Sequence, residues 1–189
     1  MLIERQNKDG FLDDSIVENA LAEFFSENDY TGKRVLTLIP DNTRSGPVGR
    51  IFKSIFDCIG QKAKALDCLV ALGTHQPLSQ EQICKRLDIT AGQRTGKYAC
   101  VKFFNHEWNK PETFTSVGKI SAEEIERLTA GLFCREVDVA INRLIFDYDE
   151  LFILGPVFPH EVVGFSGGHK YIFPGIAGSE IINFFHWLG

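Results

Sequence analysis

Short apolar runs of strand length alternate along this chain with segments that have the apolar spacing of a helix. The predicted strands cover residues 34–39, 65–72, 98–104 and 150–154, and the predicted helices cover residues 15–25, 48–59, 79–87 and 121–131. Residues 136–145 alternate as a strand does, although Asn142 and Arg143 fit a turn. This order predicts an α/β, Rossmann-like fold with a mostly parallel sheet, right-handed crossovers and helices on both faces.

Three of the predicted helices begin with the pattern of a capping box, in which a serine is followed three residues later by Glu or Gln. The pairs are Ser15 and Glu18, Ser79 and Gln82, and Ser121 and Glu124. The fourth helix follows Pro47, whose fixed φ suits a first helical turn. These signals support the helical assignment of all four segments.

The composition is that of a single globular domain over residues 1–189, with 44% hydrophobic and 24% charged residues. The net charge of −5, without a run of Lys or Arg, argues against a nucleic-acid surface. No apolar run approaches the roughly 20 residues that span a bilayer. The N-terminal residues also lack the apolar core of a signal peptide. We therefore expect a cytoplasmic protein that binds neither nucleic acid nor membrane.

The five cysteines are scattered, and no two of them form a C-x-x-C pair. They are Cys58, Cys68, Cys84, Cys100 and Cys134. Three lie in apolar stretches, where a free thiol behaves as a small hydrophobic group. We expect buried structural thiols, and the pattern indicates neither a disulfide framework nor a zinc site.

Three loops of unusual composition each follow a predicted strand at its carboxyl end. They cover residues 41–47, 73–77 and 155–178. Because parallel strands bring their carboxyl ends to one edge of the sheet, these loops should converge there, where such folds bind ligands. The convergence predicts a functional site.

The first two loops contain groups suited to acid–base or anion chemistry. Arg44, three residues after Asp41, fits an anion clamp, because a guanidinium group matches a carboxylate or phosphate. The alternative is a capping aspartate and a surface arginine. His75, and His160 in the third loop, are candidate general acid/bases because imidazole titrates near neutrality. The alternative for each is a structural or solvated histidine.

The third loop is rich in glycine, with Gly164, Gly167 and Gly168 shortly before Lys170. It resembles a phosphate loop, but it is not a Walker A motif, because the glycine spacing differs and Tyr171 follows the lysine. Backbone amides in such a run can still hold a phosphate. Lys170 is then a phosphate contact or a nucleophile that links covalently to a cofactor, and the alternative is a solvated lysine.

His186 is expected on a helix that begins near Gly178. Imidazole is a good ligand for nickel, zinc or copper. No second histidine and no carboxylate lies three or four residues away, so spacing alone favours a core or surface histidine. His106 and His169 have weaker cases, and we interpret both as structural or supporting residues.

Taken together, these residues resemble the nickel-dependent lactate racemase family. The matching pieces are Asp41 to Pro47, Ala71 to His75, and Gly155 to His186, in the order and spacing of the family. The last piece contains His160, Lys170 and His186. The resemblance extends from about the first strand to the end of the chain.

The resemblance implies a nickel-pincer nucleotide, a nicotinate-derived cofactor whose sulfurs and ring carbon bind the metal. By similarity, Lys170 carries the cofactor through a thioamide link and His186 provides the protein ligand to nickel. Asp41, Asn42, Thr43 and Arg44 contact the cofactor, and Arg44 also meets a substrate carboxylate. Proteins that synthesise and insert the cofactor are the implied partners.

The implied reaction is racemisation or epimerisation of a small 2-hydroxy acid by reversible hydride transfer to the cofactor. His75 and His160 act as an acid/base pair on opposite sides of the substrate, which explains how both enantiomers are handled. The protein contributes positioning and electrostatics, and the cofactor contributes the hydride chemistry.

Two features depart from the family pattern. Gln76 stands where arginine commonly follows the loop histidine. The chain ends three residues after His186, and we expect it to lack the second domain that closes the site in other members. The alternatives are a non-catalytic module that binds a phosphate or nucleotide, and an inactive fragment of such an enzyme. A zinc hydrolase needs three protein ligands, a pattern that the sequence does not support.

Overall fold

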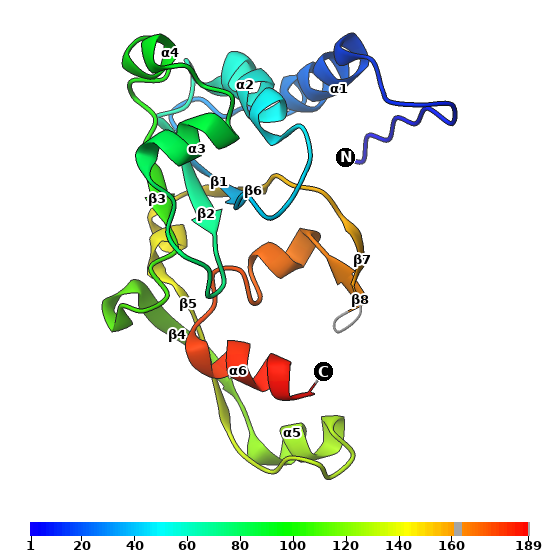
Figure 1. Ribbon diagram of the computed structural model, residues 1–189, viewed down its shortest axis with the longest axis vertical. Coiled ribbons are helices and arrows are strands. Elements are labelled where there is room, and N and C mark those ends of the chain that lie inside the picture. The colour runs from blue at the N-terminus through cyan, green and yellow to red at the C-terminus, as the bar shows by residue number, and fades with distance from the viewer. Residues whose placement is uncertain (161–163, 189) are drawn as a thin grey trace.

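The computed structural model describes residues 1–160 and 164–188 (Figure 1). Its centre is a four-stranded sheet in the order β3-β2-β1-β6, and all three pairings are parallel. The strands are β1 (Arg34–Pro40), β2 (Ala65–Ala71), β3 (Phe103–Asn105) and β6 (Glu150–Ile153). Leu38 of β1 lies between Leu69 of β2 and Ile153 of β6. The prediction of an α/β fold around a parallel sheet is confirmed.

One face of the sheet is covered by α-helices. They are α1 (Asp14–Ser26), α2 (Val48–Ile59) and α3 (Gln80–Arg86), and the short α4 (Ala91–Thr95) follows them. Val35 and Ile39 of β1 pack in one cluster with Phe52 and Phe56 of α2. All four side chains are at most 2% exposed, so the apolar area that they remove from water stabilises this layer.

The other face is covered by short 3-10 helices. Leu36 and Leu38, which alternate with Val35 and Ile39 along β1, pack against a second apolar cluster that includes Tyr171 and Ile176. The 3-10 helices η2 (Arg143–Asp147) and η3 (Gly168–Tyr171) contribute side chains to it. Helices therefore lie on both faces, as predicted, but those on the second face are 3-10 helices.

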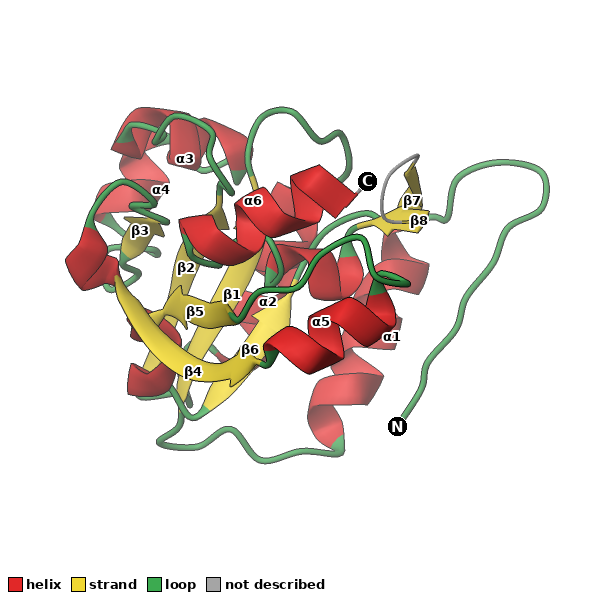
Figure 2. Ribbon diagram, turned by 90° about the horizontal axis from the view of Figure 1, so that it is seen from below, coloured by secondary structure: helices red, strands yellow, loops and turns green. Residues whose placement is uncertain are grey.

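A long antiparallel ribbon extends away from the parallel sheet. It consists of β4 (Phe114–Ile120), which follows η1 (Pro111–Thr113), and β5 (Val137–Asn142), with α5 (Ala122–Leu128) between the two strands. Figures 1 and 2 show α6 (Ser179–Leu188) beside this ribbon, where Ile181, Ile182 and Phe184 join one cluster with Val137. A smaller antiparallel pair is formed by β7 (Phe158–His160) and β8 (Gly164–Ser166).

One strand prediction is corrected, and one strand was not predicted. The strand expected over 98–104 is limited to Phe103–Asn105, and Tyr98 and Val101 are buried in turns instead. A buried turn and a buried strand have the same apolar composition, so periodicity cannot separate them. The sequence also gave no sign of β4, because most of its side chains are exposed. Residues 136–145 combine both interpretations, since β5 ends at Asn142 and η2 follows.

Two of the three serine caps are confirmed. Ser79 and Gln82 form the reciprocal capping box, and Ser121 Oγ accepts a hydrogen bond from the Glu124 amide. The prediction for Ser15 is wrong, because the N-cap of α1 is Asp13. Glu18 instead lies 3.8 Å from Arg50 of α2, so the acidic side chain is turned toward the neighbouring helix.

The expectation of buried thiols holds fully only for Cys68. Cys58 and Cys84 are half-buried against the helical layer, whereas Cys100 and Cys134 are exposed. All five are free thiols. Burial raises the pKa of Cys58, Cys68 and Cys84, which makes these three poor nucleophiles at neutral pH.

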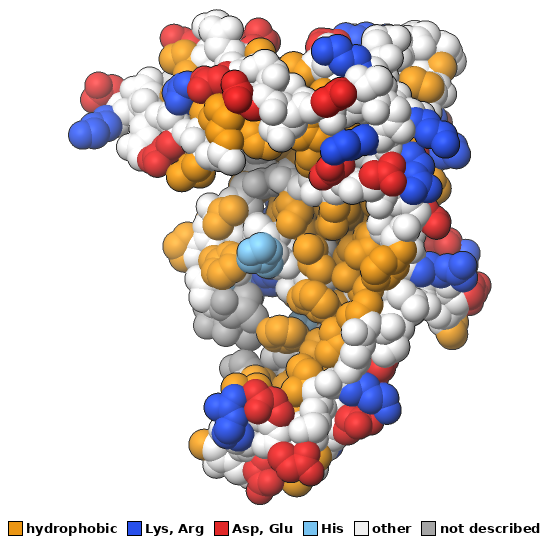
Figure 3. Space-filling view, turned by 180° about the vertical axis from the view of Figure 1, so that it is seen from behind, with side chains coloured by type: hydrophobic (Ala, Val, Ile, Leu, Met, Phe, Trp, Pro, Cys, Tyr) orange, Lys and Arg blue, Asp and Glu red, His pale blue; other side chains and the backbone are white. Residues whose placement is uncertain are grey.

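The surface seen from behind combines a hydrophobic hollow with charged regions (Figure 3). Hydrophobic side chains gather in a hollow below the helical layer, and charged side chains of both signs are interspersed above and below it. Large hydrophobic side chains that remain exposed include Phe146, Phe158 and Phe165. None of the helices in the described ranges has the length and hydropathy to cross a bilayer.

Thr37 on β1 provides a test of the packing. Its side chain is fully buried, and its hydroxyl has no hydrogen-bond partner among the described residues. Because a buried hydroxyl without a partner is destabilising, Thr37→Val should raise the free energy of unfolding by about 1 kcal/mol. Urea denaturation measures the change through the transition midpoint.

Thr129 is the matched control. It is also buried, but its hydroxyl donates to the Ile125 carbonyl at 2.8 Å and accepts from the Phe133 amide at 3.0 Å. Thr129→Val should therefore lower stability by about 1–3 kcal/mol. A lower midpoint for Thr37→Val would contradict the interpretation that the Thr37 hydroxyl is buried without a hydrogen-bond partner.

Candidate active site

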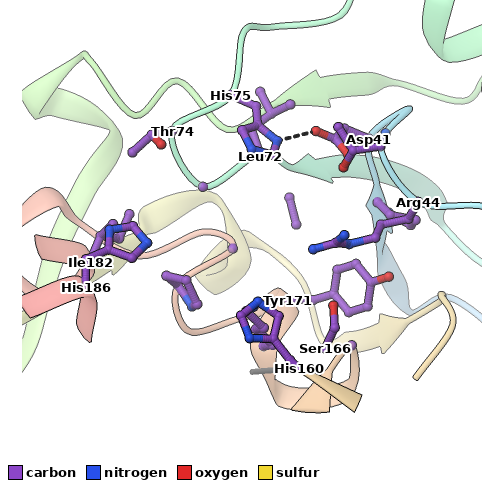
Figure 4. A pocket seen from close by; sticks show the side chains of 18 residues that line it. Asp41, Arg44, Leu72, Thr74, His75, His160, Ser166, Tyr171, Ile182 and His186 are labelled. Carbon is purple, nitrogen blue, oxygen red and sulfur yellow. Dashed lines mark hydrogen bonds and ion pairs between the residues drawn. The ribbon is translucent and has the colours of Figure 1, made fainter. Parts of the chain in front are cut away.

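A cavity of about 250 Å³ lies at the carboxyl ends of β1 and β2 (Figure 4). The segments that follow these strands form one part of its wall, and the β7–β8 hairpin, η3 and α6 form the rest. The structure brings most of the predicted site residues to this cavity: Asp41, Thr43, Arg44, His75, His160, Lys170 and His186. Asn42 is exposed and is not part of the lining.

Asp41 and His75 form a hydrogen-bonded pair across two loops. Asp41 Oδ2 lies 2.5 Å from His75 Nδ1, and Asp41 Oδ1 accepts from the Thr43 amide at 3.0 Å and from the Thr43 hydroxyl at 2.5 Å. Burial alone raises the pKa of Asp41, but the hydrogen bonds from Thr43 and His75 outweigh it, so the pKa lies below its ordinary value. The ionised carboxylate fixes the proton of the neutral imidazole on Nδ1, which leaves Nε2 to exchange a proton with a ligand.

The loop that carries Asp41 and Arg44 is supported from α3. Arg86 donates from Nη2 to the Arg44 carbonyl at 2.8 Å and from Nε to the Pro40 carbonyl at 3.4 Å. The guanidinium group of Arg44 lies over the Phe158 ring, 5.3 Å from its centroid. Arg44 is therefore held from two sides and is not a freely mobile surface cation.

Close backbone packing fixes the position of Lys170 on η3. Gly167 just before this 3-10 helix has φ +92°, and its carbonyl accepts from the Lys170 amide at 3.0 Å. A Cβ at Gly167 would lie 2.0 Å from the Pro156 carbonyl oxygen. After the helix, Gly175 donates to the Lys170 carbonyl at 3.0 Å. The glycines are needed here because the chain approaches itself too closely for a side chain.

His186 reaches the cavity from α6, as predicted from the helix that begins after Gly178. The start of this helix is fastened to β5, because the Gly178 amide donates to the Ala140 carbonyl at 2.9 Å. Within the described ranges, no group of three or more His, Cys, Asp or Glu side chains could hold a metal ion.

The charges around the cavity favour an anionic ligand. Among the lining residues that the structure describes, Arg44 and Lys170 are cations and Asp41 is the one carboxylate. Figure 4 shows His75 and His160 on opposite sides of the cavity, with Arg44 between them and His186 toward the other end. The arrangement can bind a carboxylate or phosphate and offers an imidazole on each side of it.

The family described as the lactate racemase N-terminal domain matches residues 8–188. The chain belongs to the lactate racemase family. This confirms the family that the loop residues resemble, and it covers almost the whole chain.

Two individual proteins are also similar to this chain. A lactate racemase from Thermoanaerobacterium thermosaccharolyticum is 26% identical over 155 residues, which cover 79% of this chain and 31% of that protein. A crystal structure of a protein from Thermotoga maritima has a TM-score of 0.83 at 32% identity, over 94% of this chain and 41% of that chain. The chain thus spans about a third of the curated lactate racemase that it matches.

Some residues at or next to this cavity were not singled out from the sequence. Tyr171 lines the cavity and is 7% exposed, and burial raises the pKa of its phenol, so it remains a hydrogen-bond donor at neutral pH. Trp108 donates from Nε1 to the His75 carbonyl at 3.0 Å. Tyr171 follows Lys170 directly, which was the only signal for it, and nothing local indicated Trp108.

Proposed function

We propose that this chain binds a nickel-pincer nucleotide and acts as a 2-hydroxy-acid racemase or epimerase. One observation carries the proposal: Lys170, His186, Arg44 and two opposed histidines line a single cavity. These segments are far apart in sequence, so their meeting reflects the fold. The family membership supports the same class of reaction.

The residues present fit this cofactor in their donor chemistry. His186 offers one imidazole, and the described residues contain no ligand set that could hold a metal by protein groups alone. A cofactor that brings its own sulfur and carbon donors needs only one further ligand, and such mixed soft donors suit nickel. Lys170 offers an amine in the same cavity for a covalent link, with Thr43 and Arg44 to contact the bound group.

Each side chain then has a defined role toward the substrate. When bound, the cofactor supplies the hydride acceptor that converts the 2-hydroxy acid into a planar 2-keto acid. Arg44 binds the substrate carboxylate and fixes its position. His75 removes or returns the hydroxyl proton at Nε2, while Asp41 holds the ring and stabilises its charged form. His160 performs the same exchange from the opposite side, as racemisation requires.

Attachment of the cofactor is the first test. Protein produced together with the enzymes that make and insert the cofactor should contain about one nickel per chain and show a mass adduct on Lys170. Lys170→Arg keeps the charge but should remove the adduct completely, as measured by intact mass spectrometry. Lys85→Arg, at an exposed position on α3, should keep it. An active preparation with unmodified Lys170 would overturn the proposal.

Turnover separates a catalyst from a binding module. The adduct-bearing chain should racemise at least one member of a panel of small 2-hydroxy acids. His75→Ala with His160→Ala should keep the adduct and lose turnover by a factor on the order of 10⁴. If the chain without substitutions kept the adduct but showed no turnover, it would instead be a module that only binds the cofactor.

A further inference from the structure

The proposed reaction does not use His106, and the fold buries this histidine completely. It lies just after β3, is 0% exposed and is not among the lining residues of the cavity. Both ring nitrogens have partners: Nε2 lies 3.2 Å from the Ala177 carbonyl oxygen, and Nδ1 lies 3.1 Å from the Asn142 amide nitrogen.

These partners determine where the imidazole proton is. The Asn142 side-chain oxygen accepts from the Leu144 amide at 3.0 Å, which leaves the Asn142 NH₂ group to face His106. An NH₂ group only donates, so His106 Nδ1 must accept, and the proton must lie on Nε2. The Nε2–H then donates to the Ala177 carbonyl. The ring is therefore neutral and joins two segments that are distant in sequence.

The bond to Ala177 holds the segment that leads into α6. On its other side this segment is held by β5, because Asn142 donates from its backbone to the Ile176 carbonyl at 2.9 Å. His106 itself is tied to the parallel sheet, since its amide donates to the Val70 carbonyl of β2 at 3.1 Å. A continuous path of hydrogen bonds thus connects the end of β2 with the start of the helix that carries His186.

The neighbours of His106 hold the loop that carries His75. Asn105 makes two hydrogen bonds to the backbone of Leu78, accepting from its amide at 3.0 Å and donating to its carbonyl at 2.8 Å. Trp108 donates to the His75 carbonyl at 3.0 Å. The four residues from Asn105 to Trp108 therefore contact both the His75 loop and the approach to α6.

We propose that the segment Asn105–Trp108, with His106 at its centre, is a positioning element that sets His186 and His75 relative to each other across the cavity. The roles of those two histidines rest on the proposed function, but the contacts that position them do not depend on it. Burial lowers the pKa of His106 to about 4, so its ring stays neutral near pH 7 and both of its hydrogen bonds persist.

Nuclear magnetic resonance of the ¹⁵N-labelled chain without cofactor tests the tautomer. His106 should show a bound proton on Nε2 and none on Nδ1 near pH 7. A proton on Nδ1, or rapid exchange between both forms, would overturn the arrangement. This measurement needs no variant, so it remains decisive if substitutions at His106 prevent folding.

Hydrogen exchange of the same chain tests the positioning. His106→Leu removes both hydrogen bonds and should raise exchange in residues 179–188 by about tenfold more than in β1 and β2. His106→Gln, whose side-chain amide can still donate to Ala177, should restore part of the protection. Trp108→Phe keeps an aromatic ring without the donor and should raise exchange selectively in residues 73–78.

Ile83→Val is the control for general destabilisation. Ile83 is fully buried in the helical layer, so this variant loses core packing without touching α6. It should leave exchange in residues 179–188 no higher than in the rest of the chain. An equal rise everywhere in His106→Leu, or no rise in α6, would overturn the proposal. Because no turnover is measured, failure of the proposed racemase activity would leave this result unchanged.

Discussion

Asp41→Asn should lower the racemisation rate of the cofactor-loaded protein by a factor on the order of 10²–10⁴ while leaving the Lys170 adduct in place. The carboxylate lies 2.5 Å from His75 Nδ1 and is held ionised by hydrogen bonds from Thr43 and His75. An asparagine has the same shape but no charge. It no longer stabilises the imidazolium ion that forms when His75 takes a proton.

A second readout separates this effect from a loss of structure. The His75 Nδ1–H proton, followed by nuclear magnetic resonance, should resonate less far downfield in Asp41→Asn, because an uncharged acceptor makes a weaker hydrogen bond. Asp29→Asn is a matched control, since Asp29 accepts from the Thr31 amide at 2.9 Å in the same two-residue pattern as Asp41 and Thr43, but does not line the cavity. It should leave both the rate and the His75 Nδ1–H resonance unchanged. An unaltered Nδ1–H resonance in Asp41→Asn would contradict the hydrogen bond between Asp41 and His75.

The position of the cavity followed from the sequence because this position depends on the order and direction of the strands more than on individual side-chain contacts. Once the runs at 34–39 and 65–72 are parallel strands, their carboxyl ends must lie at one edge. Asp41 and His75 then meet although 34 residues separate them. Hydrophobic periodicity and strand length were enough to establish this arrangement. The roles proposed for Lys170 and His186 needed the family resemblance, since a single lysine and a single histidine have no diagnostic spacing.

The supports of the site could not be predicted because they are long-range hydrogen bonds. His106 meets Ala177 across 71 residues and Asn142 across 36, and no local pattern marks either contact. Trp108 likewise reaches a backbone carbonyl, which any residue at position 75 would offer. Burial of a polar group forces it to find a partner but does not say which one.

Strand β4, which forms a ribbon with β5, escaped prediction for a different reason. Most β4 side chains are exposed, so the strand has no buried face to produce an apolar alternation. Its place is fixed by pairing with β5, which in turn holds the start of α6. An element without an amphipathic pattern thus helps to position the helix that carries His186.

Gly167→Ala should lower the free energy of unfolding by about 3–5 kcal/mol and prevent cofactor attachment. An alanine at φ +92° is strained, and its Cβ would lie 2.0 Å from the Pro156 carbonyl oxygen, a backbone atom that cannot rotate away. Relief of the clash must shift η3, whose first hydrogen bond joins the Gly167 carbonyl to the Lys170 amide. Urea denaturation and the intact mass of protein made with the cofactor pathway measure the two effects.

Gly164→Ala is the matched control, because Gly164 has a similar φ of +80° but open space around the position of a Cβ. It should cost only the conformational strain of about 1–2 kcal/mol and keep the adduct. The difference in the free energy of unfolding between the two variants measures the clash with Pro156, because the strain of a positive φ is common to both. If the two variants lost equal stability and both kept the adduct, the packing of Gly167 would not be what positions Lys170.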